Sequence, residues 1–336
     1  MTLKSKTSSD FSEFRGSSLP SESEIMSMWV ASSTEAPMVS VLCNAYNHEK
    51  FISDAIRGVL IQKTNFPFEL LIHDDASNDG TREIIEAYQE KYPLIIKTVF
   101  QEENQYSKGE KITLLNFSFS KGRYIAICEG DDFWVSRDNL QKKVDCLEAE
   151  KKVNLVASEA MVSYYGSRRL RTVKLNCDYF DLSKYLEREP FIATCSMVLR
   201  REVMEGWPDW ANDLFAGDFV IRYLALISGD MAIVPVRGCV YNKGVPGSWS
   251  QRRIESRVVS KEYFDNVKAL YEISKMLEDP CFLEISKKMI RLSLRYYIRL
   301  ASEQVYINRI FLFMRYSMVY SFTEVKMVVK SIIMRH

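Results

Sequence analysis

Mainly apolar segments alternate with amphipathic segments along the first 150 residues of the chain. Apolar runs of strand length occur at residues 38–43, 68–73, 94–100 and 124–128. Between these runs, apolar side chains recur every three or four positions, which predicts helices at residues 51–60, around 84–88 and at 112–119. Strands that alternate with helices predict an α/β fold, with a mixed, mostly parallel sheet flanked by helices.

The pattern is less regular after residue 140. Strands are expected at residues 153–157, 191–199 and 231–236. Helices are expected at residues 140–149, from Arg201 onward and across 214–226, and a loop is expected at 241–253. These elements define a central unit at residues 37–255, which divides into the halves 37–150 and 151–255.

Both ends of the chain differ from this central unit. Residues 1–36 are rich in Ser and Thr and poor in large apolar side chains, which predicts a flexible arm. Within the arm, residues 21–29 are expected to form a short helix that docks through Ile25 and Trp29. Residues 256–336 are expected to be helical, basic and amphipathic, and four cations lie on one helix side: Lys287, Arg291, Arg295 and Arg299. Such a region either contacts anionic lipid headgroups or covers the fold with a solvated cationic face.

Charge and composition exclude several classes of protein. Lys and Arg number 45 and Asp and Glu 44, so no overall field would attract nucleic acid. The seven cysteines are scattered without a C-x-x-C pair, which favours reduced thiols in the cytoplasm. With three histidines, a histidine zinc site or a Ser-His-Asp triad is not expected. A signal-peptide pattern and an uncharged apolar run of ~18 residues are both missing, so neither secretion nor a membrane span is expected.

Polar loops follow three of the four predicted strands in the first half, at residues 44–47, 74–79 and 129–132. Ligands of open α/β sheets bind beyond the carboxyl ends of the strands, so these loops are expected to converge. The last loop places Glu129, Asp131 and Asp132 within four positions. Carboxylates this close repel one another, so they either hold a divalent cation or lie solvated in a surface loop.

The three loops resemble motifs of the family-2 glycosyltransferases with a GT-A fold. The matching residues are Tyr46-Asn47, His73 to Thr81, and Glu129-Gly130-Asp131-Asp132, in that order along the chain. The resemblance covers residues 38–150 and is thin beyond them. It implies a GT-A-like fold and a hexosyltransferase that uses a nucleotide-sugar donor, and the helical pattern of residues 256–336 adds a C-terminal helical extension.

The resemblance also implies roles for individual residues in the donor site. Tyr46 would lie against the nucleotide base, and Asp75 would accept a hydrogen bond from the imide N–H of that base. An aromatic face and a carboxylate acceptor suit uracil, and hence a UDP-sugar. Asn44 and Asp131 would also contact the donor. Considered alone, Tyr46 is an ordinary loop tyrosine and Asp75 a solvated or helix-capping acid, whereas Asp79 is expected to cap the following helix.

The loop at residues 129–132, called the acid loop below, would hold the metal. By resemblance, Asp132 is the direct ligand of Mn²⁺ or Mg²⁺, and Asp131 lies near the metal waters or the donor ribose. A hard cation of this kind neutralises charge on a departing nucleoside diphosphate.

The family places a catalytic base at the start of a helix in the second half of the domain, often as Glu-Asp. Here the matching place reads Gly217-Asp218, so the first acid is missing and the role falls to Asp218. Its apolar helix is expected to raise the pKa of Asp218 toward a useful value. An N-cap role is the alternative, and Asp209 and Asp213 are the reserve candidates for the base.

The region after residue 241 departs from the family pattern. Lys243 stands where a histidine is common, although Lys243 and Arg252 could meet donor phosphates. The Gln-x-x-Arg-Trp signature of processive synthases is absent, which favours transfer of a single sugar.

Together these features predict an inverting, metal-dependent glycosyltransferase. Its acceptor would be a saccharide or a lipid-diphosphate-linked sugar in bacterial surface polysaccharide assembly, and it would act in the cytoplasm, with possible peripheral contact at the inner face of the membrane. The alternatives are a sugar-nucleotide nucleotidyltransferase and a non-catalytic nucleotide- or glycan-binding module. The first would carry a Gly- and Arg-rich phosphate loop after its first strand, which Asn44 to Asn47 is not.

Overall fold

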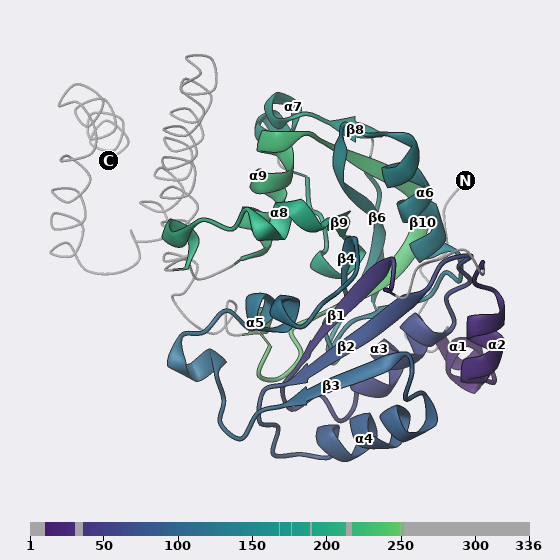
Figure 1. Ribbon diagram of the computed structural model, residues 1–336. Coiled ribbons are helices and arrows are strands. Elements are labelled where there is room, and N and C mark those ends of the chain that lie inside the picture. Colours follow the sequence, from purple (N-terminus) through teal and green to yellow (C-terminus); the bar gives the residue numbers. More distant parts are fainter. Residues whose placement is uncertain are drawn as a thin grey trace, which may run out of the picture. The chain divides into compact units, whose positions relative to one another are not determined.

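The computed structural model describes residues 11–30, 36–167, 169–175, 177–188, 190–212, 217–248 and 250–251. The strands of this part form one sheet in the order β3-β2-β1-β4-β9-β6-β10-β5, with β7 beside β6 and β8 beside β10 (Figure 1). Its mixed pairing and its covering helices confirm the predicted fold class.

The first half of the sheet is parallel. β1 (Val39–Ala45) lies between β2 (Phe68–Asp74) and β4 (Tyr124–Ile127), and β3 (Ile96–Phe100) pairs with β2. These are the four strands predicted from the apolar runs, with small shifts at their ends. Parallel strands end at a common edge, so the loops after β1, β2 and β4 leave the sheet side by side.

The second half of the sheet is mixed. β9 (Val198–Arg200) lies antiparallel between β4 and β6 (Val153–Tyr164), and β10 (Asp230–Lys243) runs parallel to β6. The two-residue strand β5 (Phe133–Trp134) follows the acid loop and pairs antiparallel with β10. The short strands β7 (Leu170–Val173) and β8 (Tyr179–Phe180) complete the sheet.

Two predictions in this half are wrong. A strand is expected at residues 191–199, but the observed strand β9 begins only at Val198. The preceding residues 194–196 form the 3₁₀ turn η3 (Thr194–Ser196). There the Cys195 carbonyl accepts a hydrogen bond from Trp134 Nε1 (2.7 Å) instead of a strand partner. The loop expected from residue 241 begins later, because residues 241–243 still pair with β6.

Helices cover both faces of the sheet. α3 (Ile52–Leu60) packs with Val39 and Val41, whereas α5 (Ile112–Ser118) hydrogen-bonds the Asn44 side chain. Side chains on a strand alternate between its faces, so these two helices lie on opposite sides of β1 (Figure 1). Beyond the N-terminal arm, the remaining helices of this part are α4 (Thr81–Lys91), α6 (Asn139–Ala149), α7 (Leu182–Arg188), α8 (Arg201–Glu205), α9 (Asp218–Ser228) and the 3₁₀ turns η2 (Tyr106–Lys108) and η4 (Asp209–Ala211).

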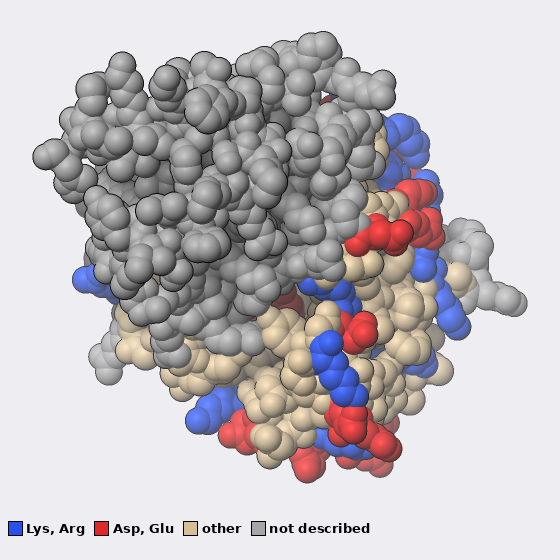
Figure 2. Space-filling model, turned by 90° about the vertical axis from the view of Figure 1, so that its left-hand side faces the viewer, with Lys and Arg blue, Asp and Glu red and all other residues tan. Residues whose placement is uncertain are grey.

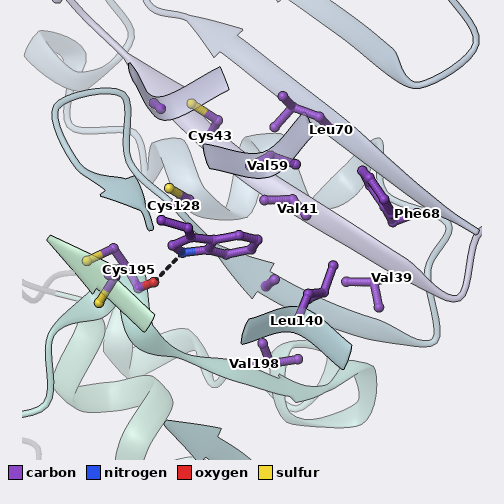
Figure 3. Packing of buried hydrophobic residues seen from close by; sticks show 14 of the residues in the cluster. Val39, Val41, Cys43, Val59, Phe68, Leu70, Cys128, Leu140, Cys195 and Val198 are labelled. Carbon is purple, nitrogen blue, oxygen red and sulfur yellow. Dashed lines mark hydrogen bonds between the residues drawn. The ribbon is translucent and has the colours of Figure 1, made fainter. Parts of the chain in front are cut away.

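Trp134 joins the two halves of the core. Its ring is fully buried among β1, β4, α3 and α6, and its hydrogen bond to the Cys195 carbonyl is the dashed line of Figure 3. Buried thiols lie in the same cluster, including the labelled Cys43, Cys128 and Cys195 (Figure 3). Six cysteines of the described residues are free, in agreement with the expected reduced thiols.

The N-terminal arm contains two helices, α1 (Ser12–Gly16) and α2 (Glu22–Ser27). α2 begins with a capping box between Ser21 and Glu24. It docks as predicted, because Ile25 is fully buried and Trp29 packs edge-on against Phe68 at 5.7 Å. Residues 11–30 are therefore part of the packed fold, and the expected flexibility does not hold for them.

The chain divides into two compact units, residues 1–212 with 217–255, and residues 213–216 with 256–336. The second unit, with the predicted basic amphipathic helices, lies outside the described residues. Among the described residues, no helix has the length and apolarity needed to cross a bilayer. On the face seen in Figure 2, Lys and Arg side chains lie next to Asp and Glu side chains over the described surface.

Candidate active site

Backbone hydrogen bonds join the three motif loops at the end of β1. The Asp75 N–H donates to the Ala45 carbonyl, and the Gly130 N–H donates to the Asn44 carbonyl, both at 2.9 Å. The loops after β2 and β4 are thus tied to the loop after β1. The structure places the three motifs on one rim of the sheet.

The acid loop approaches this rim closely at Gly130. A Cβ atom at this position would lie 2.7 Å from His48 Nδ1 and 3.1 Å from Ile52 Cδ1. Any larger residue would displace these side chains or the loop, since such contacts are shorter than van der Waals separations. Glycine therefore lets the flanking acids lie against the end of β1.

Asp132 is held below the surface of the acid loop. Its side chain is 1% exposed, and its Oδ1 accepts a hydrogen bond from the Asn242 N–H (2.8 Å). Its Oδ2 lacks a hydrogen bond of normal geometry among the described residues. Burial and the Asp131 and Glu129 carboxylates raise the pKa of Asp132 well above its ordinary value, and the Asn242 N–H and Cys195 thiol act in the opposite direction. Asp132 thus has one oxygen engaged by β10 and one available.

Asp131 lies nearer the surface than Asp132 and is half-buried. Its carbonyl accepts a hydrogen bond from Asn242 Nδ2 (2.6 Å), so Asn242 contacts both aspartates. Among the described residues, no group of three or more His, Cys, Asp and Glu side chains is arranged to hold a metal ion. A cation at the acid loop would therefore need further ligands from outside this set of side chains.

Glu129 is a site residue that sequence reasoning left without a role. Burial, followed by the Asp131 and Asp218 carboxylates, raises the pKa of Glu129 to about 8. This effect places Asp218 within electrostatic reach of the acid loop, although 86 positions separate it from Asp132 in the sequence. The sequence does contain a signal for Glu129, because this residue is the first of three neighbouring acids in the motif.

Asp218 begins α9, but its surroundings differ from the apolar environment predicted for it. Its Oδ2 accepts a hydrogen bond from the Arg222 guanidinium at 2.8 Å, and Arg222 Nε donates to the Tyr185 hydroxyl at 2.8 Å. The two residues are one helical turn apart, so their spacing already indicated the pair. The expectation based on apolar surroundings is wrong, because a buried cation accompanies the carboxylate. Gly217 is the N-cap, Asp209 is exposed in η4, and Asp213 lies outside the described residues.

Tyr46 and Asp75 lie on the same rim with different exposure. The Tyr46 side chain is 39% exposed after β1, whereas Asp75 is 2% exposed. Asp75 Oδ1 accepts a hydrogen bond from the Gln105 N–H (2.7 Å) and Oδ2 accepts one from the Tyr106 N–H (3.0 Å). Asp75 therefore already fixes the loop after β3, a contact that the sequence did not predict.

The remaining predicted donor residues have distinct positions. Both polar atoms of the Asn44 side chain are bonded to α5, with Nδ2 donating to Thr113 Oγ1 and Oδ1 accepting from Asn116 Nδ2, each at 3.0 Å. Lys243 ends β10, with its ammonium 5.8 Å from the Tyr164 ring centre. Arg252 lies outside the described residues.

Asp79 and its neighbours secure the loop after β2. Asp79 Oδ1 accepts a hydrogen bond from the Thr81 N–H in the first turn of α4 (3.0 Å), which agrees with the predicted structural role. Its Oδ2 accepts one from the Glu49 N–H (3.2 Å), and the His48 N–H donates to Thr81 Oγ1 (2.7 Å). These bonds hold the loops after β1 and β2 together beside Tyr46.

Two proteins of related sequence match different lengths of the chain. An uncharacterized protein of Mycobacterium tuberculosis is 29% identical over 220 residues, which are 65% of this chain and 62% of the relative. The Escherichia coli protein WfaP, a UDP-Glc:alpha-D-GlcNAc-diphosphoundecaprenol beta-1,3-glucosyltransferase, is 32% identical over 115 residues, or 34% of this chain and 43% of WfaP. The chain thus spans less than two thirds of the length of these relatives.

Solved structures share the fold. TarS (residues 1–349) of S. aureus in complex with UDP-GlcNAc has a TM-score of 0.58 at 17% identity, and the match covers 76% of this chain and 71% of TarS. The mannosyltransferase PcManGT of Pyrobaculum calidifontis, in complex with GDP-Man and Mn²⁺, has a TM-score of 0.51 at 17% identity, and the match covers 93% of this chain and 86% of that chain. At these identities the likeness concerns the fold alone, which is the GT-A fold.

The sequence profile described as Glycosyl transferase family 2 matches residues 40–207, which is half of the chain. The matched segment runs from β1 through the acid loop to the end of α8, and so contains the three motif loops. The chain belongs to glycosyltransferase family 2.

Proposed function

We propose that this protein transfers one sugar, with inversion, from a nucleotide-diphosphate donor to an acceptor hydroxyl. The observation that carries the proposal is the convergence of Tyr46, Asp75, the acid loop and Asp218 from four parts of the sequence. A UDP-sugar is the donor class best supported, since an exposed aromatic ring and a carboxylate acceptor share one rim. WfaP, a relative, carries a UDP-sugar in its name.

The acid loop has the chemistry of a divalent-cation site. Among the described residues Asp132 Oδ2 has no hydrogen-bond partner, and burial together with the neighbouring carboxylates raises the pKa values of Asp132 and Glu129, so a bound cation would stabilise the ionised acids. Asp131 and Asp132 would hold Mn²⁺ or Mg²⁺, and donor phosphates would complete the ligand set, since the described side chains do not. When bound, the ion would neutralise charge on the leaving nucleoside diphosphate.

Asp75 has capacity for the nucleotide base in addition to its present contacts. An ionised carboxylate offers about four lone-pair positions, and two are used by the Gln105 and Tyr106 N–H groups. The base would therefore bind beside the loop after β3, with Tyr46 against its face. Asn44 would act by positioning, since its side chain is fixed to α5.

Asp218 is the proposed base that accepts the proton of the acceptor hydroxyl. A carboxylate at this position can accept a proton from a hydroxyl as a general base. Arg222 fixes the orientation of the carboxylate, because it is itself bonded to Tyr185. With Asp218 accepting its proton, the acceptor oxygen would attack the anomeric carbon directly as the bond to the diphosphate breaks, so that the configuration inverts.

The acceptor class proposed is a lipid-diphosphate-linked saccharide, in bacterial surface polysaccharide assembly. The name of WfaP states such an acceptor for that protein. The reaction would then take place at the inner face of the cytoplasmic membrane.

A donor screen with purified protein tests the proposal. Protein, Mn²⁺, a panel of UDP- and GDP-sugars and lipid-diphosphate-sugar acceptors are combined, and products are identified by mass spectrometry. The expected result is a product one sugar heavier than the acceptor, with a UDP-sugar, that disappears on chelation. Product that persists in chelator would refute the metal role, and donor bound without any product would favour a binding module.

A further inference from the structure

The helix α1 in the N-terminal arm packs beside the acid loop. Phe11 and Phe14 contact Phe133, the residue that directly follows Asp132. The Phe11 ring lies edge-on to Phe133 at 5.2 Å, and the Phe14 ring is stacked on it at 5.3 Å. These rings form a small second core with Met161 and Val240, separate from the main core around Trp134.

Phe133 and Trp134 fix the end of the acid loop from two sides. Neighbouring residues of a strand point to opposite faces, so Trp134 enters the main core and Phe133 enters the cluster under α1. On the backbone, Phe133 pairs with Val240 of β10, and the same strand supplies Asn242 to Asp131 and Asp132. Without this arm, Phe133 would keep Met161 and Val240 but lose both of its aromatic neighbours.

α1 is itself attached to the body of the fold. The Arg57 guanidinium of α3 donates hydrogen bonds to the Phe14 carbonyl (3.2 Å) and the Ser17 carbonyl. Arg15 forms an ion pair with Asp54 of α3 at 2.6 Å. A five-residue helix is too short to be stable alone, so these contacts and the aromatic cluster hold it in place.

We propose that α1 is a positioning element of the active site, in which Phe11 and Phe14 hold Phe133 and thereby fix Asp131 and Asp132 for the cation and the donor diphosphate. The inference rests on the proposed function. Residues that orient metal ligands change metal affinity by about 10- to 100-fold when they are replaced. Because α1 touches neither acid, its effect would pass through Phe133 and the backbone of the acid loop.

The test compares Phe14→Ala and Phe14→Leu with Trp29→Ala. Trp29 lies in the same arm but packs on Phe68 at the other end of the first half of the sheet. It therefore controls for the loss of an aromatic contact without disturbing Phe133. Free Mn²⁺ is measured by electron paramagnetic resonance during titration of each protein with Mn²⁺ in the presence of UDP, and sugar transfer is measured at each Mn²⁺ concentration.

Phe14→Ala is expected to weaken Mn²⁺ binding roughly tenfold, with kcat at saturating Mn²⁺ changed much less. Phe14→Leu, which still covers Phe133, should recover most of the affinity, and Trp29→Ala should leave it unchanged. Equal Mn²⁺ affinity in wild type and Phe14→Ala would overturn the inference and leave α1 as a structural cap. Mn²⁺ binding by the wild type without sugar transfer would overturn the proposed function alone, whereas no Mn²⁺ binding would overturn the inference together with the metal site.

Discussion

Lys143 is a buried cation without a hydrogen-bond partner in the described part of the core. The residue is 0% exposed in α6, and its ammonium lies 5.8 Å from the Trp134 ring centre. Burial lowers the pKa of Lys143 from 10.5 to about 8, while the nearby thiols of Cys239, Cys195 and Cys128 act in the opposite direction. The folded state thus disfavours the charged form that dominates at neutral pH.

The size of this effect follows from the difference between the folded and unfolded pKa values. Each pKa unit corresponds to about 1.4 kcal/mol, so the shift opposes folding by about 3 kcal/mol at pH 7. The folded pKa is lowered, so the penalty is complete below about pH 8 and disappears as the pH rises toward the unfolded value. Lys143→Met keeps most of the side-chain volume and removes the charge. We expect this variant to be more stable than the wild type by about 1–3 kcal/mol at pH 7.

Urea unfolding at pH 7 and pH 10 measures this prediction. The gain in free energy of unfolding should be largest at pH 7 and should shrink to less than about half at pH 10. Lys142→Met is the matched control, since Lys142 is the preceding residue of α6 and is half-exposed in an ion pair with Asp138. That control should change stability by less than about 1 kcal/mol at either pH. A Lys143→Met variant less stable than the wild type at pH 7 would refute the reasoning, because Lys143 would then have a compensating partner.

Three further variants test the site. Gly130→Ala should lower the free energy of unfolding by about 1–3 kcal/mol through the contact with His48, with partial recovery in Gly130→Ala/His48→Ala, as measured by urea unfolding. Asp75→Asn replaces one acceptor oxygen with a donor, so the backbone amide of Tyr106 or Gln105 loses its acceptor. That amide should exchange its hydrogen faster with solvent, and UDP affinity should fall. Unchanged hydrogen exchange would contradict the hydrogen bonds described. Asp218→Asn should lower kcat by about 10²- to 10⁴-fold with UDP affinity kept, and wild-type turnover in this variant would remove its assignment as the base.

The parallel half of the sheet could be predicted because its strands are buried on both faces and read as apolar runs. β1, β2 and β4 belong to this class, and their common edge followed from the topology. The second half could not be predicted as well. The apolar residues before Val198 pack around Trp134 as a 3₁₀ turn, and apolarity alone does not distinguish such packing from a strand.

The site showed the same division between local and long-range information. The motif loops were recognisable, because each is a contiguous polar segment at a strand end. The Asp218–Arg222 pair is readable from its four-residue spacing, although the surrounding helix is mainly apolar. The contacts of α1 with Phe133 were not readable, because they join residues more than 100 positions apart in a segment that is otherwise polar.

The charges of the site connect the acid loop with the proposed base. Glu129 is influenced by Asp131 and by Asp218, Asp132 is influenced by Asp131 and Glu129, and Arg222 is the cation paired with Asp218. A nucleoside diphosphate is itself an anion, so this group of acids would repel it in the absence of a counter-ion. A divalent cation would offset much of that repulsion and attract the diphosphate directly, and a diphosphate would in turn supply oxygen ligands that the described side chains do not provide. Donor and cation are therefore each expected to bind poorly alone and well together, which ties substrate binding to the metal through electrostatics.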